Sequence, residues 1–386
     1  MEKAILKPAT VTTANRLYYL DWIRVITIIF VFLFHCCMFF TSWDWHVKNA
    51  VASPTFDVIA FILIQWMMPM FFFISGASTW YALQTKTSGK FVVDRLKRIL
   101  VPLIFGIFIL SPHQVYLERF THHQFDGSFI DFIPYYFHGW YAFGGNFAWM
   151  GLHLWYLLLL FVFSLILLPL FLFIKRKTVT NDQFRYPIIL LLAFVLLLAL
   201  PGWMLKPDGF PGGRLWGGWS MFEHLVMLAI GYFTFSRPEI IRLWTRFKTV
   251  ILIITILLTA FNIYLYVDHI MFEFGTMLYM LKVLLRASVC FGWIFTIMGF
   301  AELRLNYTNK TLKYANQAVL PFYILHQPVI ILFGYFIVQT QLSIGLKYFI
   351  IAGVSFVIVI CLYQFLVQRS NVLRFLFGMG KLRVSK

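Results

Sequence analysis

An apolar run near the start of the chain, YLDWIRVITIIFVFLFHCC, carries the ionisable side chains Asp21, Arg24 and His35. Ionisable groups are costly in hydrocarbon, so each is a candidate functional residue. Arg24 and His35 are eleven residues apart and therefore share one helix face, about 16 Å from each other at about 1.5 Å per residue. The structural alternatives are an Arg24 anchor paired with Asp21 and a core His35 bonded to a carbonyl. Their shared face favours a cation at one end and a proton-accepting imidazole at the other.

Polar side chains interrupt several other apolar runs. They are Glu223 with His224, Lys282 with Arg286, His326 with Gln327, His113 with Gln114, and His153 with Trp155. Packing alone would not need so many polar groups, so they predict a cavity between the helices toward which they converge. Lys282 and Arg286 are four residues apart and face one neighbouring surface, where we expect them to meet an anion, either Glu223 or a ligand.

The composition requires membrane-spanning helices to hold these residues. Of 386 residues, 61% are hydrophobic and only 12% are charged, which is too few to cover a water-facing surface. The cysteines lie inside apolar runs, so no disulfide framework is expected. Runs of about 20 apolar residues predict an all-α, polytopic membrane helix bundle with about ten transmembrane helices, at 17–41, 56–83, 99–118, 149–174, 186–205, 217–235, 249–267, 274–301, 315–338 and 345–367.

The net charge of +17 is distributed unevenly between the loops. Most Lys and Arg lie at the termini and after the even-numbered spans, whereas the loops on the other side carry only Lys48, Arg119, Lys206, Arg214 and Lys347. This bias follows the positive-inside rule, so we expect both termini to be cytoplasmic. It also explains the basic composition without a nucleic-acid partner.

This topology defines the expected organisation of the chain. One membrane-embedded domain would cover residues 1–386, with a cytoplasmic segment 1–16 and a basic cytoplasmic tail 368–386. The long loop 119–148 would lie outside. Its aromatic residues suit either an interfacial belt or stacking on sugar rings.

Five motifs together resemble acyltransferase family 3. They are the Arg-x10-His spacing of LDWIRVITIIFVFLFH, MFFFISG in the second span, the Arg-x-x-Arg of DRLKRILVP, HLWYL and FYILHQP. The resemblance implies a membrane enzyme that takes an acyl group, acetyl or succinyl, from acyl-CoA. The group would be placed on a hydroxyl of a glycan or similar acceptor outside the cytoplasmic membrane. The segment DWHVKN and the proline after FYILHQ are most similar to the branch with the periplasmic glucan succinyltransferases.

The resemblance implies a catalytic role for His35, which would take the acceptor proton as a base or carry the acyl group as a nucleophile. Many sugar O-acyltransferases of this family have an Asp before the Phe-Phe of the second span, but this chain has Pro69 there. Glu223 is the candidate replacement for that carboxylate.

The resemblance also implies two sets of binding residues. Arginine side chains suit phosphates, so Arg24, Arg95 and Arg98 would hold acyl-CoA, with Lys282 and Arg286 as a second cation pair. Expected substrate contacts are Asp44, His46, His153, Trp155 and His326. No metal is predicted.

Two other functions fit parts of the pattern. A glycan or lipid transporter, or flippase, would also line its path with polar side chains, but transporters often carry inverted repeats, and none is visible here. An intramembrane metal hydrolase would need a ligand spacing such as HExxH, which this sequence lacks.

Overall fold

The computed structural model describes residues 16–179, 187–208 and 216–382, and this part of the chain is helical with no extended strand. Most of the predicted segment 1–16 and the last four residues of the predicted tail lie outside the described residues. The helices are α1 Tyr18–Cys37, α2 Pro54–Ile64, α3 Met67–Thr85, α4 Ser88–Arg95, α5 Val101–Phe105, α6 Pro112–Thr121, α7 Phe129–Tyr136, α8 Trp155–Ile166, α9 Leu168–Val179, α10 Pro187–Met204, α11 Met221–Phe235, α12 Pro238–Val267, α13 Met277–Arg304, α14 Lys310–Val338, α15 Ile344–Leu362 and α16 Asn371–Leu376.

Six helices in the described residues are long and apolar enough to cross a membrane, or up to eight if each of two bent pairs counts as one span. Two shorter apolar helices, α10 and α11, occupy the positions of the predicted fifth and sixth spans. The predicted all-helical membrane protein is therefore confirmed. The count of about ten spans and the sidedness of the termini stay predictions.

The bent pairs lie at the predicted spans 99–118 and 149–174. The first bends by 41° where Ser111 precedes Pro112, and the second bends by 54° after Ile166, just before Pro169. Proline cannot donate a backbone hydrogen bond, which explains why a straight helix ends at these points. The predicted seventh span, 249–267, is also incomplete, because α12 begins at Pro238. The hydrophobic run excludes the charged first turns of that helix.

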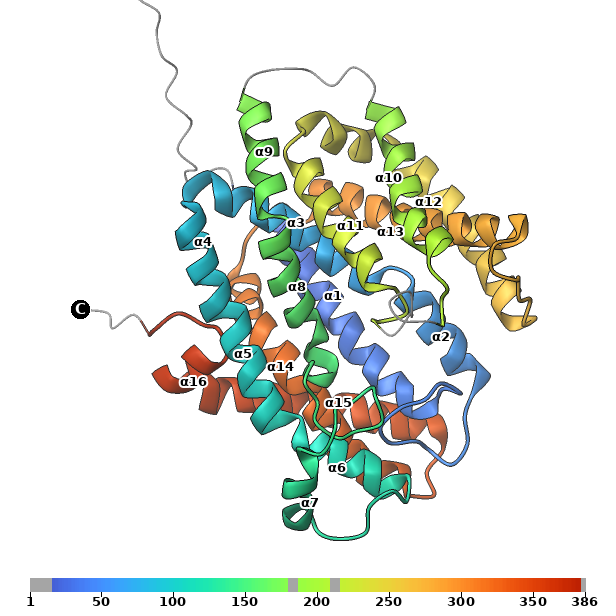
Figure 1. Cartoon of the computed structure of the whole chain (residues 1–386), viewed down its shortest axis with the longest axis vertical. Helices are drawn as coiled ribbons and strands as arrows, with labels where there is room; N and C mark the ends of the chain where they lie inside the picture. The colour runs from blue at the N-terminus through green and yellow to red at the C-terminus, as the bar shows by residue number, and fades with distance from the viewer. Residues whose placement is uncertain (1–15, 180–186, 209–215, 383–386) are drawn as a thin grey trace, which may run out of the picture.

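Helix α1 occupies the centre of the molecule and contacts α2, α3, α13, α14 and α15. Figure 1 shows α6 and α7 together at one end and the facing ends of α9 and α10 at the other. We call the end formed by α6, α7 and segment 137–151 the loop end. Of the elements that carry the predicted chemistry, α3 and α14 pack against α1, and Phe71 and Phe72 of α3 contact Tyr156 of α8.

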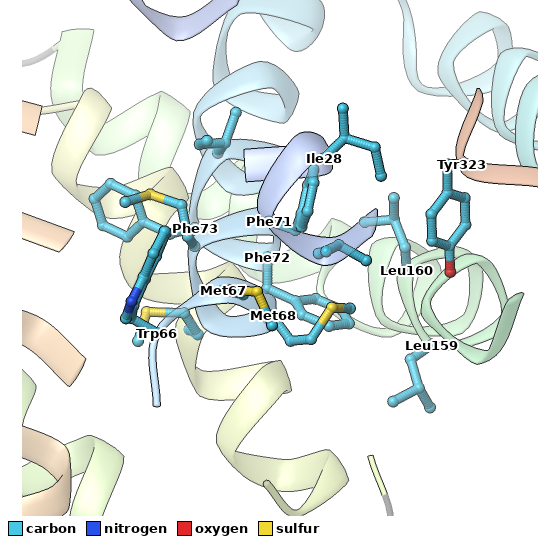
Figure 2. Packing of buried hydrophobic residues seen from close by; sticks show 14 of the residues in the cluster. Ile28, Trp66, Met67, Met68, Phe71, Phe72, Phe73, Leu159, Leu160 and Tyr323 are labelled. Carbon is cyan, nitrogen blue, oxygen red and sulfur yellow. The ribbon is translucent and has the colours of Figure 1, made fainter. Parts of the chain in front are cut away.

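The segment MFFFISG gives α3 its close contact with α11. A Cβ atom on either Gly76 or Gly231 would overlap backbone atoms of the opposite helix, so only glycine permits this crossing. Beside the crossing, Phe71 and Phe72 pack in the core together with Ile28 of α1 and Leu160 of α8 (Figure 2). This packing fixes α3 against both α1 and α8, which supply the polar residues described next.

Candidate functional site

Three arginines predicted to act together line one cavity of about 320 Å³, which we call the arginine cavity. Arg24 donates from Nη2 to Ser78 Oγ at 2.9 Å and forms an ion pair with Asp21 at 3.2 Å. Arg95 donates to Thr79 Oγ1 at 2.8 Å. The exposed Arg98 has no hydrogen-bond partner within the part of the chain that the structure describes. One guanidinium is thus available to a ligand, and two are held in fixed positions.

The arginine cavity extends along α1 and α14 toward the histidine predicted to be catalytic. Ile28, one turn beyond Arg24, contributes to its wall, as does Tyr323 of α14. Tyr156, which follows HLW in the fourth predicted span, lines the same cavity and bonds Ser75 Oγ at 2.7 Å. The cavity therefore joins the family motifs of four helices, α1, α3, α8 and α14.

Beyond Tyr323 lie three histidines from different helices, which we call the histidine cluster: His35, His153 and His326. The rings of His35 and His326 have centroids 4.9 Å apart, and those of His153 and His326 are 5.2 Å apart. His35 is half-buried, whereas the other two are buried. Tyr323 connects the cluster to the arginine cavity, because its hydroxyl donates to the backbone carbonyl of His153 and its own carbonyl bonds His326.

Neighbouring carbonyls determine which ring nitrogens carry hydrogen, since a carbonyl oxygen only accepts. The Nδ1–H of His326 donates to Tyr323 O at 2.6 Å, so its Nε2 carries a lone pair. The Nδ1–H of His35 is shared between Val31 O at 2.9 Å and His326 Nε2 at 3.1 Å. In this arrangement the Nε2 atom of His35 carries a lone pair and has no hydrogen-bond partner among the described residues. A base or a nucleophile requires such a free lone pair.

A second polar network connects the cluster to the loop end. Nδ1 of His46 bonds Glu118 Oε2, and the amide of Gln327, the residue after His326, donates to His46 Nε2 at 3.2 Å. Tyr141 donates to Glu118 Oε2 at 2.8 Å, and Arg119 donates to Oε1 at 3.0 Å. Burial, and then the Glu118 carboxylate, raise the pKa of Tyr141 well above its usual range, so its hydroxyl remains a donor.

Two lysines hold the loop that carries His46. Lys48 Nζ donates to the carbonyls of Met38 at 2.8 Å and Trp43 at 2.8 Å, and Lys347 Nζ donates to Asn49 Oδ1 at 2.8 Å. Lysine is therefore used here as a backbone clamp. Asp44, another predicted substrate contact, is exposed on this loop.

Another predicted site residue, Glu223, lies apart from the arginine cavity and the histidine cluster. Glu223 lies in the capping box of α11, where its carboxylate accepts from Ser220 N at 2.7 Å. The residues that contact the His35 ring include Val31, Trp45 and His326 but not Glu223, so the structure does not bring Glu223 to the histidine predicted to be catalytic.

Lys282 and Arg286 also lie outside the lining of the arginine cavity. Lys282 donates to Asn262 Oδ1 at 2.6 Å, and Arg286 donates to Gly218 O and lies over the ring of Trp219 at 3.7 Å. Trp155 packs on His224 with centroids 5.3 Å apart, although His153, two residues earlier, belongs to the histidine cluster. We call Glu223, His224, Lys282 and Arg286 the α11–α13 group.

Glu118 is a residue of the polar network around His46 that the sequence analysis did not select. It is the carboxylate that contacts a predicted site histidine, His46, and it stands at the last position of the predicted third span. The rule that an ionisable residue within a span is a functional candidate would have selected it. The proximity of Tyr141 and Arg119 was not readable from the sequence, because it depends on how the outer loop folds.

The described residues contain no group of three or more His, Cys, Asp or Glu side chains that could hold a metal ion. The three histidines of the cluster instead direct ring nitrogens at carbonyl groups and at each other. A metal hydrolase gains no support from this arrangement.

Comparison with known proteins agrees with the motifs that converge here. The sequence matches the family described as Acyltransferase domain over residues 17–364. Glucans biosynthesis protein C of Escherichia coli strain SMS-3-5 is 24% identical over 384 residues, and that of strain K12 is 23% identical over 384 residues. Each alignment covers 95% of this chain and 95% of the relative.

Proposed function

This chain belongs to the Acyltransferase domain family and is a multi-pass membrane protein, and from that premise we propose that it is an O-acyltransferase of the inner membrane. The donor is cytoplasmic acyl-CoA carrying an acetyl or succinyl group. The acceptor is a hydroxyl group of a glycan outside the membrane, and the names of the relatives support a glucan. One observation carries the proposal: a cavity lined by three arginines reaches Tyr323, whose backbone carbonyl accepts from His326 and whose hydroxyl donates to the backbone carbonyl of His153.

The arginine cavity supplies the donor site. CoA carries several phosphates, and fixed guanidinium groups are suited to bind them. On the predicted sidedness this cavity lies toward the cytoplasm, where acyl-CoA is made. Arg24 and His35 are eleven residues apart on the continuous helix α1, a rise of about 16 Å. The thioester arm of CoA would follow this face to bring the acyl group to His35.

The free lone pair on His35 Nε2 supplies the base. It takes the proton from the acceptor hydroxyl while the oxygen forms a bond to the thioester carbonyl carbon. The carbon–sulfur bond then breaks, and the CoA thiolate takes the proton back from His35. His326 accepts the Nδ1 hydrogen of His35 and thereby stabilises the ring while it is positively charged.

Sided proteoliposomes test this reaction. Acyl-CoA with a labelled acyl group is enclosed on one side, a glucan oligosaccharide is placed on the other, and ester on the glucan is measured by mass spectrometry. We expect ester across the membrane with stoichiometric free CoA thiol, and none with liposomes that lack protein. Movement of glucan across the membrane without ester would support the transporter and overturn the proposal. A stable acyl adduct on His35 would replace the base role with a nucleophilic one.

A further inference from the structure

A second cavity, of about 490 Å³, lies at the loop end among side chains of the segment 119–146. Its volume lies within the range of roughly 300–1,000 Å³ that small-molecule sites occupy. The lining residues are Arg119, Gln124, Phe125, Phe132, Tyr135, Gly144 and Asn146. The set combines three aromatic rings with three side chains that bear hydrogen-bond donors.

The aromatic side of this outer pocket is preformed. Phe125 packs on Phe132 with centroids 5.1 Å apart and on Tyr135 with centroids 5.3 Å apart. Phe132 is buried beneath, whereas Tyr135 is 49% exposed and presents ring surface to the pocket. An aromatic surface of this kind binds an apolar, flat ligand face, such as the C–H face of a sugar ring.

The polar side is arranged by Arg119, which donates to Asn146 Oδ1 at 2.8 Å, Gln124 Oε1 at 2.9 Å and Gly145 O at 3.0 Å. Its contact with Glu118 uses a fourth of the five guanidinium hydrogens, so one donor is left for a ligand. The side-chain oxygen of Gln124 accepts from Arg119, whereas the side-chain NH₂ of Gln124 has no partner among the described residues. The pocket therefore offers neutral and cationic donors to ligand oxygens.

The loop that closes the pocket is held by its own backbone hydrogen bonds. Asn146 N donates to His138 O at 2.9 Å, and Phe147 N donates to Gly139 O at 2.9 Å. Ala142, at the tip, has a φ of 72°, a conformation that costs a non-glycine residue free energy and is concentrated at functional sites. The pocket is also connected to the chemistry, because Arg119 contacts Glu118, which bonds His46.

We propose that the outer pocket binds one sugar ring of a neutral glycan acceptor, stacked on Tyr135 and hydrogen-bonded by Gln124 and Arg119. This inference rests on the proposed function and specifies its acceptor class and binding residues. A phosphorylated or acidic glycan would fit less well, because Glu118 already occupies the cationic side of Arg119. The acceptor would thus be held beside the network that leads to the histidine cluster.

The test uses the full chain in nanodiscs and three neutral oligosaccharides of different linkage, laminarihexaose, sophorohexaose and maltohexaose. Binding is measured by calorimetry without donor, and the acceptor KM is measured with acyl-CoA. We expect at least one sugar to bind, Tyr135→Ala to weaken its binding about tenfold, and Gln124→Ala to weaken it about fivefold. Affinity for acyl-CoA should not change in either variant.

Phe143→Ala is the matched control, because Phe143 lies in the same loop, is 70% exposed and does not line the pocket. Equal losses in Phe143→Ala and Tyr135→Ala, unchanged binding in Tyr135→Ala, or no binding of any of the three sugars would overturn the outer pocket. Ester transfer that is insensitive to Tyr135 would overturn the pocket and leave the proposed function intact. Tyr135-dependent sugar binding without ester transfer would support the outer pocket and overturn the proposed function.

Discussion

Two groups of polar side chains lie within the same helical bundle and differ in what their polar atoms face. The first, which we call the open group, comprises the arginine cavity and the histidine cluster. There, Arg98 of the segment between α4 and α5 and the Nε2 atom of His35 in α1 have no partner among the described residues, and the arginines line a cavity. In the α11–α13 group, Glu223 caps its own helix, and Lys282 and Arg286 bond an amide and a carbonyl. Ionisable residues in a membrane helix thus serve either an open site or a closed structural network, and the environment of their atoms separates the two roles.

The largest effect should come from removing the lone pair that defines the open group. His35→Ala should reduce acyl transfer by about 10²–10⁴-fold, because the residue supplies proton transfer. Thermal stability should fall far less than transfer, because the change removes the ring contacts of a half-buried residue with Trp45 and His326 but does not alter the fold of α1. His122→Ala, at an exposed histidine outside the cluster, is the control and should retain full activity. Activity of His35→Ala within about threefold of the parent would remove the histidine from the mechanism.

The arginine cavity gives the next effect. Arg98→Ala should weaken acyl-CoA binding by about tenfold to a hundredfold, because a hydrogen bond to a charged group is worth about 1.5–3 kcal/mol. The rate at saturating donor should be nearly unchanged, since the phosphates are remote from the thioester. Lys97→Ala is a matched control, because Lys97 is also exposed but does not line the cavity. Equal losses in both variants would return Arg98 to the role of a membrane anchor.

Helical periodicity made part of this assembly predictable. The Arg-x10-His spacing placed Arg24 and His35 on one continuous helix, and runs of apolar residues located helices near each predicted span. The bends at Ser111 and after Ile166 were harder to place, because proline is tolerated within membrane helices and does not by itself mark a break.

The partners of the polar residues were not predictable, because they depend on tertiary contacts. Glu223 has the residue type expected of a histidine partner, but a local capping box with Ser220 engages it. Glu118 meets His46 only because α6 packs against α14 and beside the loop after α1. Residue type and position within a predicted span therefore identify candidate site residues. Which of these residues come together is decided by the packing of the helices.

The α11–α13 group should respond in the opposite way from the open group. Lys282→Met and Arg286→Met should each destabilise the protein by about 1–3 kcal/mol, because each removes a donor from an acceptor, the buried Asn262 for Lys282 and the half-buried Gly218 for Arg286. Thermal unfolding in detergent would show a lower Tm, while acyl-CoA affinity stays at the parental value. If either variant loses donor affinity but keeps its Tm, these cations belong to the donor site after all. The distinction between the two groups would then fail.

The smallest effect should arise at Tyr141, the last residue of the network that runs from Gln327 through His46 and Glu118 to the loop end. Tyr141→Phe removes one hydrogen bond to Glu118 and should reduce transfer by no more than about fivefold, since such a bond is worth about 1 kcal/mol.

The pH dependence of stability tests the same residue independently. The folded protein raises the pKa of Tyr141, through burial and then through Glu118, above the unfolded value of about 10. Below that pH the hydroxyl is protonated in both states, so its contribution is fully present. Above it the unfolded chain loses the proton first, and stability declines as pH rises. The free energy of unfolding should therefore fall more steeply above about pH 10 in the parent than in Tyr141→Phe. Parallel curves would show that Glu118 does not hold this hydroxyl, and the network would then end at His46.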